Sequence, residues 1–175
     1  MASPDNTLNT LFTNSGGAFK KFQEWSWFPA TGTYAEDIGT ASGWLNGGTN
    51  TLNPGQAVWI YNPGTTTVTN TFVGTVPSGT LNNVLLPQTY NLMSSILPTS
   101  GDIVTNSLML FTNATKKDQA WAYSSATQGF SESVSGGGSA WPNGGDPVQP
   151  IAGGFFYFNA GTVANTWVEN FSVSQ

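Results

Sequence analysis

The chain has 175 residues and contains no cysteine, no histidine and no arginine. Without cysteine there is no disulfide framework and no thiolate for catalysis or metal binding. Without histidine as well, the usual zinc sites and any Ser-His or Cys-His catalytic pair are excluded. We therefore predict no cofactor and no metal, and a pair of carboxylates is the catalytic arrangement left to weigh.

Charge is also scarce. Charged residues make up 7% of the chain, and the net charge is −5. The four basic residues are lysines in two separate pairs, at 20–21 and 116–117. Recognition of nucleic acid needs clustered cations, so nucleic acid is not an expected partner. No run of about 18 apolar residues occurs, so no membrane span is expected.

Aromatic and small polar residues are abundant instead. The chain contains 11 Phe, 7 Trp and 5 Tyr, and 38% of its residues are hydrophobic, a composition that indicates a folded protein. With so few charges, the surface has to be covered by Thr, Asn, Ser, Gly and Gln. Such a surface repels other copies of the protein only weakly, and it permits close association between them.

A short segment occurs twice. Residues 20–27 read Lys-Lys-Phe-Gln-Glu-Trp-Ser-Trp, and residues 116–123 read Lys-Lys-Asp-Gln-Ala-Trp-Ala-Tyr. Matches continue on both sides in the same order: 11–14 with 110–113, Tyr34 with Phe130, Glu36 with Glu132, Ile38 with Val134, Trp44 with Trp141, and 58–62 with 155–159. Only small insertions separate these matches, so we infer an internal duplication. The chain then divides into a first repeat unit, 1–79, and a connector with a second repeat unit, 80–175.

Short segments with the character of strands fill both units, and no amphipathic helical pattern of useful length occurs. The expected strands are 8–12, the one carrying Trp25 and Trp27, 33–38, 57–61 and 66–76, one or two within 81–100, then 108–111, the one carrying Trp121 and Tyr123, 155–158 and 167–173. The predicted fold class is all-β, with two pseudo-symmetric antiparallel units of sandwich or barrel type.

Two of these segments, 57–61 and 155–158, are unbroken apolar runs. A strand of this kind needs cover on both of its faces. Both are therefore expected to be central strands of buried sheets, and Trp59 is expected to be a buried core residue.

Five motifs carry a resemblance to a known family: 6–12, 52–59, 71–79, 90–98 and 167–173. The third reads Thr-Phe-Val-Gly-Thr-Val-Pro-Ser-Gly and the last reads Trp-Val-Glu-Asn-Phe-Ser-Val. Together they resemble a family of secreted internal-repeat β-proteins of unknown function, typical of Verrucomicrobia and Planctomycetes. The resemblance covers nearly the whole chain. It implies a secreted, extracellular or cell-surface location, with the leader absent from this chain, and it implies no known reaction.

The chain departs from that family in one place. Family members carry a segment like 90–97 before the first unit as well as before the second, whereas this chain has it only before the second. The first unit is therefore expected to lack one strand and to have an open edge. An open edge pairs readily with a strand of another chain.

Few carboxylates lie near the repeated aromatic residues. Glu36, Asp37 and Glu132 do, and a two-carboxylate glycoside hydrolase would need such groups to face each other. Glu36 and Glu132 take matched positions in different units, which need not bring them together, so exposed charges at strand ends are the favoured interpretation. Asp102 and Asp146 lie near glycine-rich turns, but outside any ligand-dense calcium pattern. No catalytic or metal-binding residue is predicted.

Six aromatic residues are candidates for ligand binding: Trp25, Trp27, Trp44, Trp121, Tyr123 and Trp141. The four on expected strands are suited to stacking on sugar rings and equally to filling a small β core, and the core is favoured. Trp44 and Trp141 are better binding candidates because each lies in a loop rich in Gly and Asn. A loop tryptophan, however, also often caps the open end of a sandwich.

Three functions from different classes remain. The favoured one is a non-catalytic extracellular structural or interaction protein that self-associates through strand pairing as a subunit of a surface or filamentous assembly. The alternative is a carbohydrate-binding module whose exposed aromatics bind a polysaccharide. The third, ranked last, is a two-carboxylate glycoside hydrolase.

Overall fold

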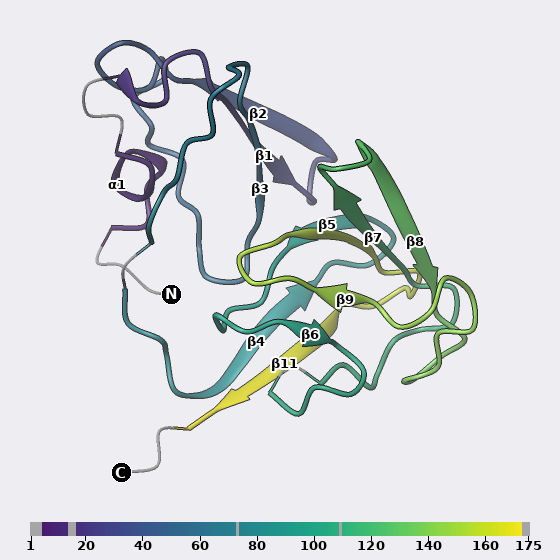
Figure 1. Ribbon diagram of the computed structural model, residues 1–175. Coiled ribbons are helices and arrows are strands. Elements are labelled where there is room, and N and C mark those ends of the chain that lie inside the picture. The colour runs from purple at the N-terminus through teal and green to yellow at the C-terminus, as the bar shows by residue number, and fades with distance from the viewer. Residues whose placement is uncertain (1–4, 14–16, 73, 109, 173–175) are drawn as a thin grey trace.

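The computed structural model describes residues 5–13, 17–72, 74–108 and 110–172 of the chain (Figure 1). The described elements are one short helix and eleven strands, so the all-β prediction is confirmed. The strands form four antiparallel sheets with three, four, two and two members. None of the described residues belongs to a helix that is long and apolar enough to cross a membrane.

The first sheet has three strands in the order β2-β1-β3. Their bounds are β1 Gln23–Phe28, β2 Thr33–Ile38 and β3 Val58–Tyr61. β1 and β2 form a hairpin in which Trp25 lies opposite Glu36, and on its other side Trp25 lies opposite Trp59 of β3. Because directly opposite residues project from the same face of a sheet, these three side chains share one face.

The second sheet has four strands in the order β5-β10-β7-β8. Their bounds are β5 Tyr90–Met93, β7 Gln119–Ser124, β8 Gly129–Val134 and β10 Phe155–Phe158. Trp121 lies opposite Glu132 of β8 and Phe156 of β10, the same register that Trp25 has in the first sheet. β10 lies between β5 and β7, which confirms the prediction that 155–158 is a central strand.

Each hairpin starts at a lysine in the left-handed region of the backbone map. Lys21 has φ 69° and Lys117 has φ 74°, values uncommon for non-glycine residues. Their backbone N–H groups donate to the carbonyls of Gly39 and Ser135, at 2.7 and 2.9 Å. The same residue pair of the repeated sequence thus makes the same local distortion where both hairpins begin.

Two smaller sheets cover the second sheet on the face opposite Trp121. Their strands are β4 Gly79–Leu85 with β11 Asn165–Phe171, and β6 Gly101–Asp102 with β9 Val148–Gln149. Leu85 and Trp167 from the first of these pack with Met93, Phe155 and Tyr157 in the larger hydrophobic core. β4 and β5 are the strands expected within the connector.

The first sheet is covered on its corresponding face by irregular chain and by the helix α1, Leu8–Leu11. A second hydrophobic core lies there, formed by Leu8, Phe12, Phe19, Phe22 and Trp44. Ile60 of β3 packs against this core. In Figure 1 the helix and the long loops lie beside the first sheet, whereas strands surround the second.

Several expected strands are absent from their predicted places. Residues 8–12 were expected to form a strand, but Leu8–Leu11 is a helical turn. The N–H groups of Thr10 and Leu11 bond to the Thr7 carbonyl, and those of Leu8 and Asn9 bond to the Asn50 and Gly48 carbonyls. The described parts of 66–76 and 108–111 contain no regular strand; Val73 and Met109 lie outside the described residues. The final strand ends at Phe171, and Val173 also lies outside them.

The prediction for 57–61 is wrong in its placement. The segment does form β3, but β3 is the last strand of its sheet, and Trp59 and Ile60 are only half-buried. Tyr61 is 56% exposed. An apolar run predicts cover on both faces, but it does not predict that a neighbouring strand fills both edges.

Candidate functional site

The outer edge of β3 has no partner strand among the residues that the structure describes. In an antiparallel sheet the N–H and C=O of one residue point to the same side, and successive residues alternate. The Gly39 N–H donates to the Phe22 carbonyl, so the Phe22 carbonyl points toward the β2 side of β1. By alternation along β1, the backbone N–H and C=O of Trp25 point toward β3, and those of its partner Trp59 point toward β1. Val58 and Ile60 then direct their N–H and C=O groups outward, away from every described strand.

The corresponding edge of the second sheet is filled. Phe155 and Tyr157 of β10 take the places that Val58 and Ile60 take in β3, and they lie opposite Met93 and Asn91 of β5. The first sheet therefore has three strands where the second has four, as expected for the first unit.

β5 also touches the start of the β3 segment. The Ala57 N–H donates to the Leu92 carbonyl at 3.4 Å, and the Ser94 N–H donates to the Gly55 carbonyl at 2.9 Å. These bonds join the two sheets at one corner. Backbone groups of residues 57 and 59 point to the same side because they are two residues apart, so these bonds lie on the β1 side of the segment. They do not use the backbone groups of Val58 and Ile60, which point to the other side.

An apolar groove lies alongside β3. It has a volume of about 360 Å³, and its lining includes Val58, Ile60, Phe12, Phe72, Leu97 and Ile151. Phe72 is 37% exposed and Ile151 is 63% exposed, so the groove is accessible to solvent. A strand that paired with Val58 and Ile60 would direct alternate side chains toward this groove.

The aromatic faces of the two sheets pack against each other. Trp59 contacts Tyr123, Phe130 and Phe156, with ring centroids 4.8, 5.7 and 6.2 Å apart. Trp27 contacts Phe156 at 6.2 Å and donates its Nε1–H to the Tyr90 carbonyl at 2.6 Å. The repeated tryptophan strands thus meet each other through the same face.

Packing between the two aromatic faces leaves a hollow of about 320 Å³, which we call the aromatic cage. Six aromatic side chains line it: Trp27, Tyr34, Tyr90, Trp121, Phe130 and Phe156. Tyr34, Tyr90 and Phe130 are 45%, 38% and 50% exposed, so the cage opens to solvent.

Of the six cage residues, Trp27 and Trp121 were among the candidates predicted from the sequence, and the other four were not. For two of them a signal was present: Tyr34 and Phe130 are matched positions on strands whose alternation places them on the faces of Trp27 and Trp121. Nothing in the sequence indicated that the two faces would meet.

Trp44 and Trp141 are not exposed platforms. Each is 5% exposed, Trp44 in the smaller core and Trp141 in the larger one. Trp44 stacks on Phe19 and donates its Nε1–H to the Phe12 carbonyl at 3.1 Å. The glycine-rich loops fold inward and insert the indoles into the cores, so the prediction that these two bind ligand is wrong.

Trp25, Trp27, Trp121 and Tyr123 are half-buried between the two sheets. Trp27 and Trp121 reach the aromatic cage, whereas Tyr123 packs on Trp59 and Phe130. Trp25 contacts Tyr34 at 6.4 Å. Of the six candidates, Trp27 and Trp121 remain on a surface that a ligand reaches.

The carboxylates are arranged differently from expectation. Asp37 was expected to be exposed, but it is fully buried, and its carboxylate accepts N–H groups of Ile38, Asn46 and Gly48. It thereby holds the loop that inserts Trp44. Glu36 and Glu132 are half-buried and lie opposite Trp25 and Trp121.

Three further carboxylates are fully buried: Glu24, Asp118 and Glu169. Burial raises the pKa of Glu24, whose Oε1 accepts the Ser26 hydroxyl at 2.5 Å. Glu169 accepts the Asn83 amide, the Ile96 N–H and the Ser95 hydroxyl. Each buried carboxylate therefore ties chain segments together.

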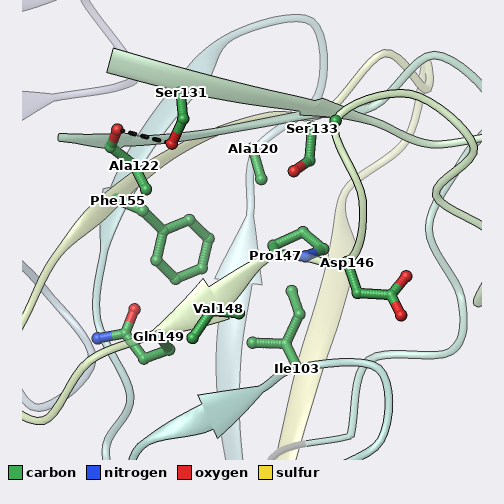
Figure 2. Close-up of a pocket in the computed structure, with 11 residues that line it drawn as sticks. Ile103, Ala120, Ala122, Ser131, Ser133, Asp146, Pro147, Val148, Gln149 and Phe155 are labelled. Carbon is green, nitrogen blue, oxygen red and sulfur yellow. Dashed lines mark hydrogen bonds between the residues drawn. The ribbon is translucent and has the colours of Figure 1, made fainter. Parts of the chain in front are cut away.

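A smaller cavity of about 170 Å³ lies between the second sheet and β9 (Figure 2). Ser131, Ser133 and Phe155 line one side, and Gln149 lines the other. Asp146 borders it, but its carboxylate points away from the cavity.

The carboxylate of Asp102 accepts the Val104 N–H at 2.6 Å and thereby forms a local turn. Within the described ranges no three acidic residues gather as metal ligands do.

Comparisons with protein-family models, curated proteins and solved structures found no match.

Proposed function

We propose that this chain is a non-catalytic extracellular structural or interaction protein, which associates with other copies of itself through the outer edge of β3. The observation that carries the proposal is the pairing difference between the sheets: β10 has a partner strand on both edges, and β3 has one on a single edge. A free strand edge of apolar sequence pairs readily with another strand.

The simplest partner for this edge is the same edge of a second copy, because no other surface of the protein is then needed. Antiparallel pairing about a twofold axis sets Trp59 opposite Trp59 of the other copy and Val58 opposite its Ile60. The outward N–H and C=O groups of both residues are then satisfied. A twofold contact of this kind needs only one self-complementary surface, which makes it the commonest form of homo-oligomer.

The chemistry of the edge suits such a contact. β3 reads Val-Trp-Ile-Tyr and carries no charge, so two copies do not repel each other there. Paired strands also extend over the apolar groove beside β3 and cover part of it. The pairing spans four residues, so the association is weak and depends on concentration. Larger surface or filamentous assemblies would require a second contact.

The non-catalytic part of the proposal rests on how the buried carboxylates are used. Asp37, Asp118 and Glu169 each accept several hydrogen bonds from the protein itself, and these bonds fix loops to strands. Carboxylates occupied in this way stabilise the fold rather than act on a substrate.

We further propose that the chain arose by internal duplication, with units 1–79 and 80–175. The hairpins share their registers, their lysine distortion and the hydrogen bonds around it. The interface between the sheets is also reciprocal: Trp59 contacts Tyr123, and Phe156 contacts Trp27, which is the same pair with the units exchanged.

The test is the molar mass of the protein in solution, measured by light scattering and sedimentation across a wide concentration range. We expect a reversible increase in mass with concentration. Val58→Pro removes an outward N–H without removing a bond to β1, so it should abolish the increase. Val58→Ala removes most of the same side chain but keeps the N–H, and it should still associate.

A peptide with the sequence of residues 90–97 provides a second test. It should compete for the β3 edge, because the same segment fills the corresponding edge of β10. A protein that stays monomeric at every concentration, or a Val58→Pro variant that associates like the original, would overturn the proposal.

A further inference from the structure

The aromatic cage is a shallow hollow, widely open to solvent, whose rings stand at several angles to one another. Phe156 of β10 lies at the centre of its contacts, and the planes of Trp27 and Tyr90 stand at 86° and 84° to the Phe156 ring. Phe130 is tilted by 48° to the same ring. Rings in such different orientations present both faces and edges to a ligand, whereas a sugar platform presents ring faces in one plane.

The polar atoms of the cage rings already have partners within the protein. Trp27 donates its Nε1–H to the Tyr90 carbonyl, and Trp121 donates its own to Gln119 Oε1 at 3.4 Å. The Tyr90 hydroxyl donates to the same Gln119 oxygen, and the Tyr34 hydroxyl bonds with Trp59. The cage therefore offers a ligand aromatic rings and few free hydrogen-bonding groups.

Two acidic residues share the sheet faces that form the cage, outside its lining. Glu36 and Glu132 project from the same faces as the cage residues, opposite Trp25 and Trp121. Glu36 Oε1 is buried and has no hydrogen-bond partner among the described residues. The strands that line the cage contain no lysine, and the net charge of the chain is −5. A cationic ligand is favoured by both its charge and the faces of the rings.

We propose that the aromatic cage binds a quaternary ammonium group. Its methyl groups pack on an apolar aromatic surface, its charge interacts with the ring faces, and it has no N–H that needs an acceptor. A primary ammonium would lose hydrogen bonds to water that the cage does not replace, and a sugar would lose those of its hydroxyls. A volume of about 320 Å³ lies at the lower end for ligand pockets and suits a compact ligand.

The experiment is a titration of the protein with choline and with tetramethylammonium, followed by calorimetry and by tryptophan fluorescence. We expect saturable binding of both cations. The neutral analogue 3,3-dimethylbutan-1-ol has the same shape as choline without the charge, and it should bind at least about tenfold more weakly. Ethanolamine and cellobiose should bind no better than the neutral analogue.

Variants locate the site. Phe156→Leu keeps an apolar side chain but removes a ring, and it should weaken choline binding by about 3- to 30-fold. Glu132→Gln should weaken it several-fold at low salt and less at high salt. Phe28→Leu is the matched control, because Phe28 is 45% exposed and lies on the opposite face of β1. It should leave binding unchanged.

Where Phe156→Leu does not fold, Tyr34→Leu replaces it, since Tyr34 is 45% exposed and lines the cage. Equal binding of choline and its neutral analogue would overturn the proposal and indicate an ordinary apolar pocket. Binding of cellobiose without binding of choline would overturn it in favour of a carbohydrate site. An absence of binding by both cations would also overturn it.

Discussion

Asp118 is expected to be the most sensitive polar residue of the second unit. It is fully buried beside the start of β7, and its carboxylate accepts three hydrogen bonds from three separate parts of the chain. The donors are the Thr115 N–H at 2.7 Å, the Ala160 N–H at 2.7 Å and the Tyr157 hydroxyl at 2.5 Å. These bonds join the segment before β7 to β10 and to the turn that follows β10.

Asp118→Asn keeps the size of the side chain but replaces one accepting oxygen with an NH₂ group that itself donates. At least one of the three donors then faces another donor, and the remaining bonds lose the carboxylate charge. Hydrogen bonds to charged groups contribute about 1.5–3 kcal/mol each, and an unsatisfied buried group costs about 1–3 kcal/mol. The expected loss of stability is about 3–5 kcal/mol.

The assay is urea-induced unfolding at pH 7, followed by tryptophan fluorescence, with the slope of the transition checked for constancy. Tyr157→Phe removes one of the three donors and leaves the carboxylate with the other two, so it should cost less, about 1–3 kcal/mol. Asp146→Asn, at an exposed carboxylate, should change stability by less than about 0.5 kcal/mol. A loss below about 1 kcal/mol in Asp118→Asn would refute the assignment of Asp118 as a buried clamp.

Other changes test other parts of the fold. Burial raises the pKa of Glu24 above its value in the unfolded chain, so the folded protein holds the proton of this group more tightly. The contribution of Glu24 to stability therefore falls as pH rises from about 4.5 through the raised pKa. Unfolding across a pH series should show that Glu24→Gln removes this fall. Trp59→Ala should cost about 2–3 kcal/mol in denaturant unfolding because Trp59 is half-buried, less than the 3–5 kcal/mol expected for the fully buried Trp167→Ala. Gly39→Ala should prevent normal folding by circular dichroism, since its Cβ would lie 1.7 Å from the Phe19 carbonyl oxygen, whereas Gly43→Ala meets no atom within 4 Å and should fold.

The strands that the sequence predicted well are those with a local pattern and a repeated partner. β1, β2 and β7 contain alternating residues beside turn residues. β8 was not among the expected strands, but it repeats the register of β2, so that Trp25 and Trp121 pair with matched glutamates. The apolar run 155–158 predicted a central strand, and β10 does lie between two neighbouring strands, β5 and β7. In these cases short-range sequence and long-range packing favour the same structure.

The errors occur where tertiary contacts decide the outcome. Residues 8–12 have the composition of a strand, but the antiparallel pairing with the 50–52 segment stops at a bridge between Thr7 and Thr51, and Leu8 and Phe12 enter the smaller core from a helical turn. Trp44 lies in a polar loop, yet the bonds of Asp37 to Asn46 and Gly48 fold that loop inward. A carboxylate that organises a loop through backbone N–H groups has no local sequence signature.

The open edge of β3 is a consequence of how the connector is used. β5 occurs once, and it uses both of its own edges: one pairs with β10, and the other bonds to residues 55 and 57 and accepts from Trp27. Moving β5 to close β3 would break all of these bonds, so the connector has no free strand to give to the first sheet. Among the described strands none is therefore free to close this edge, so pairing with a second copy would not displace any of them. Association through β3 should then be rapid and reversible, because no strand has to be withdrawn from one copy before it joins another.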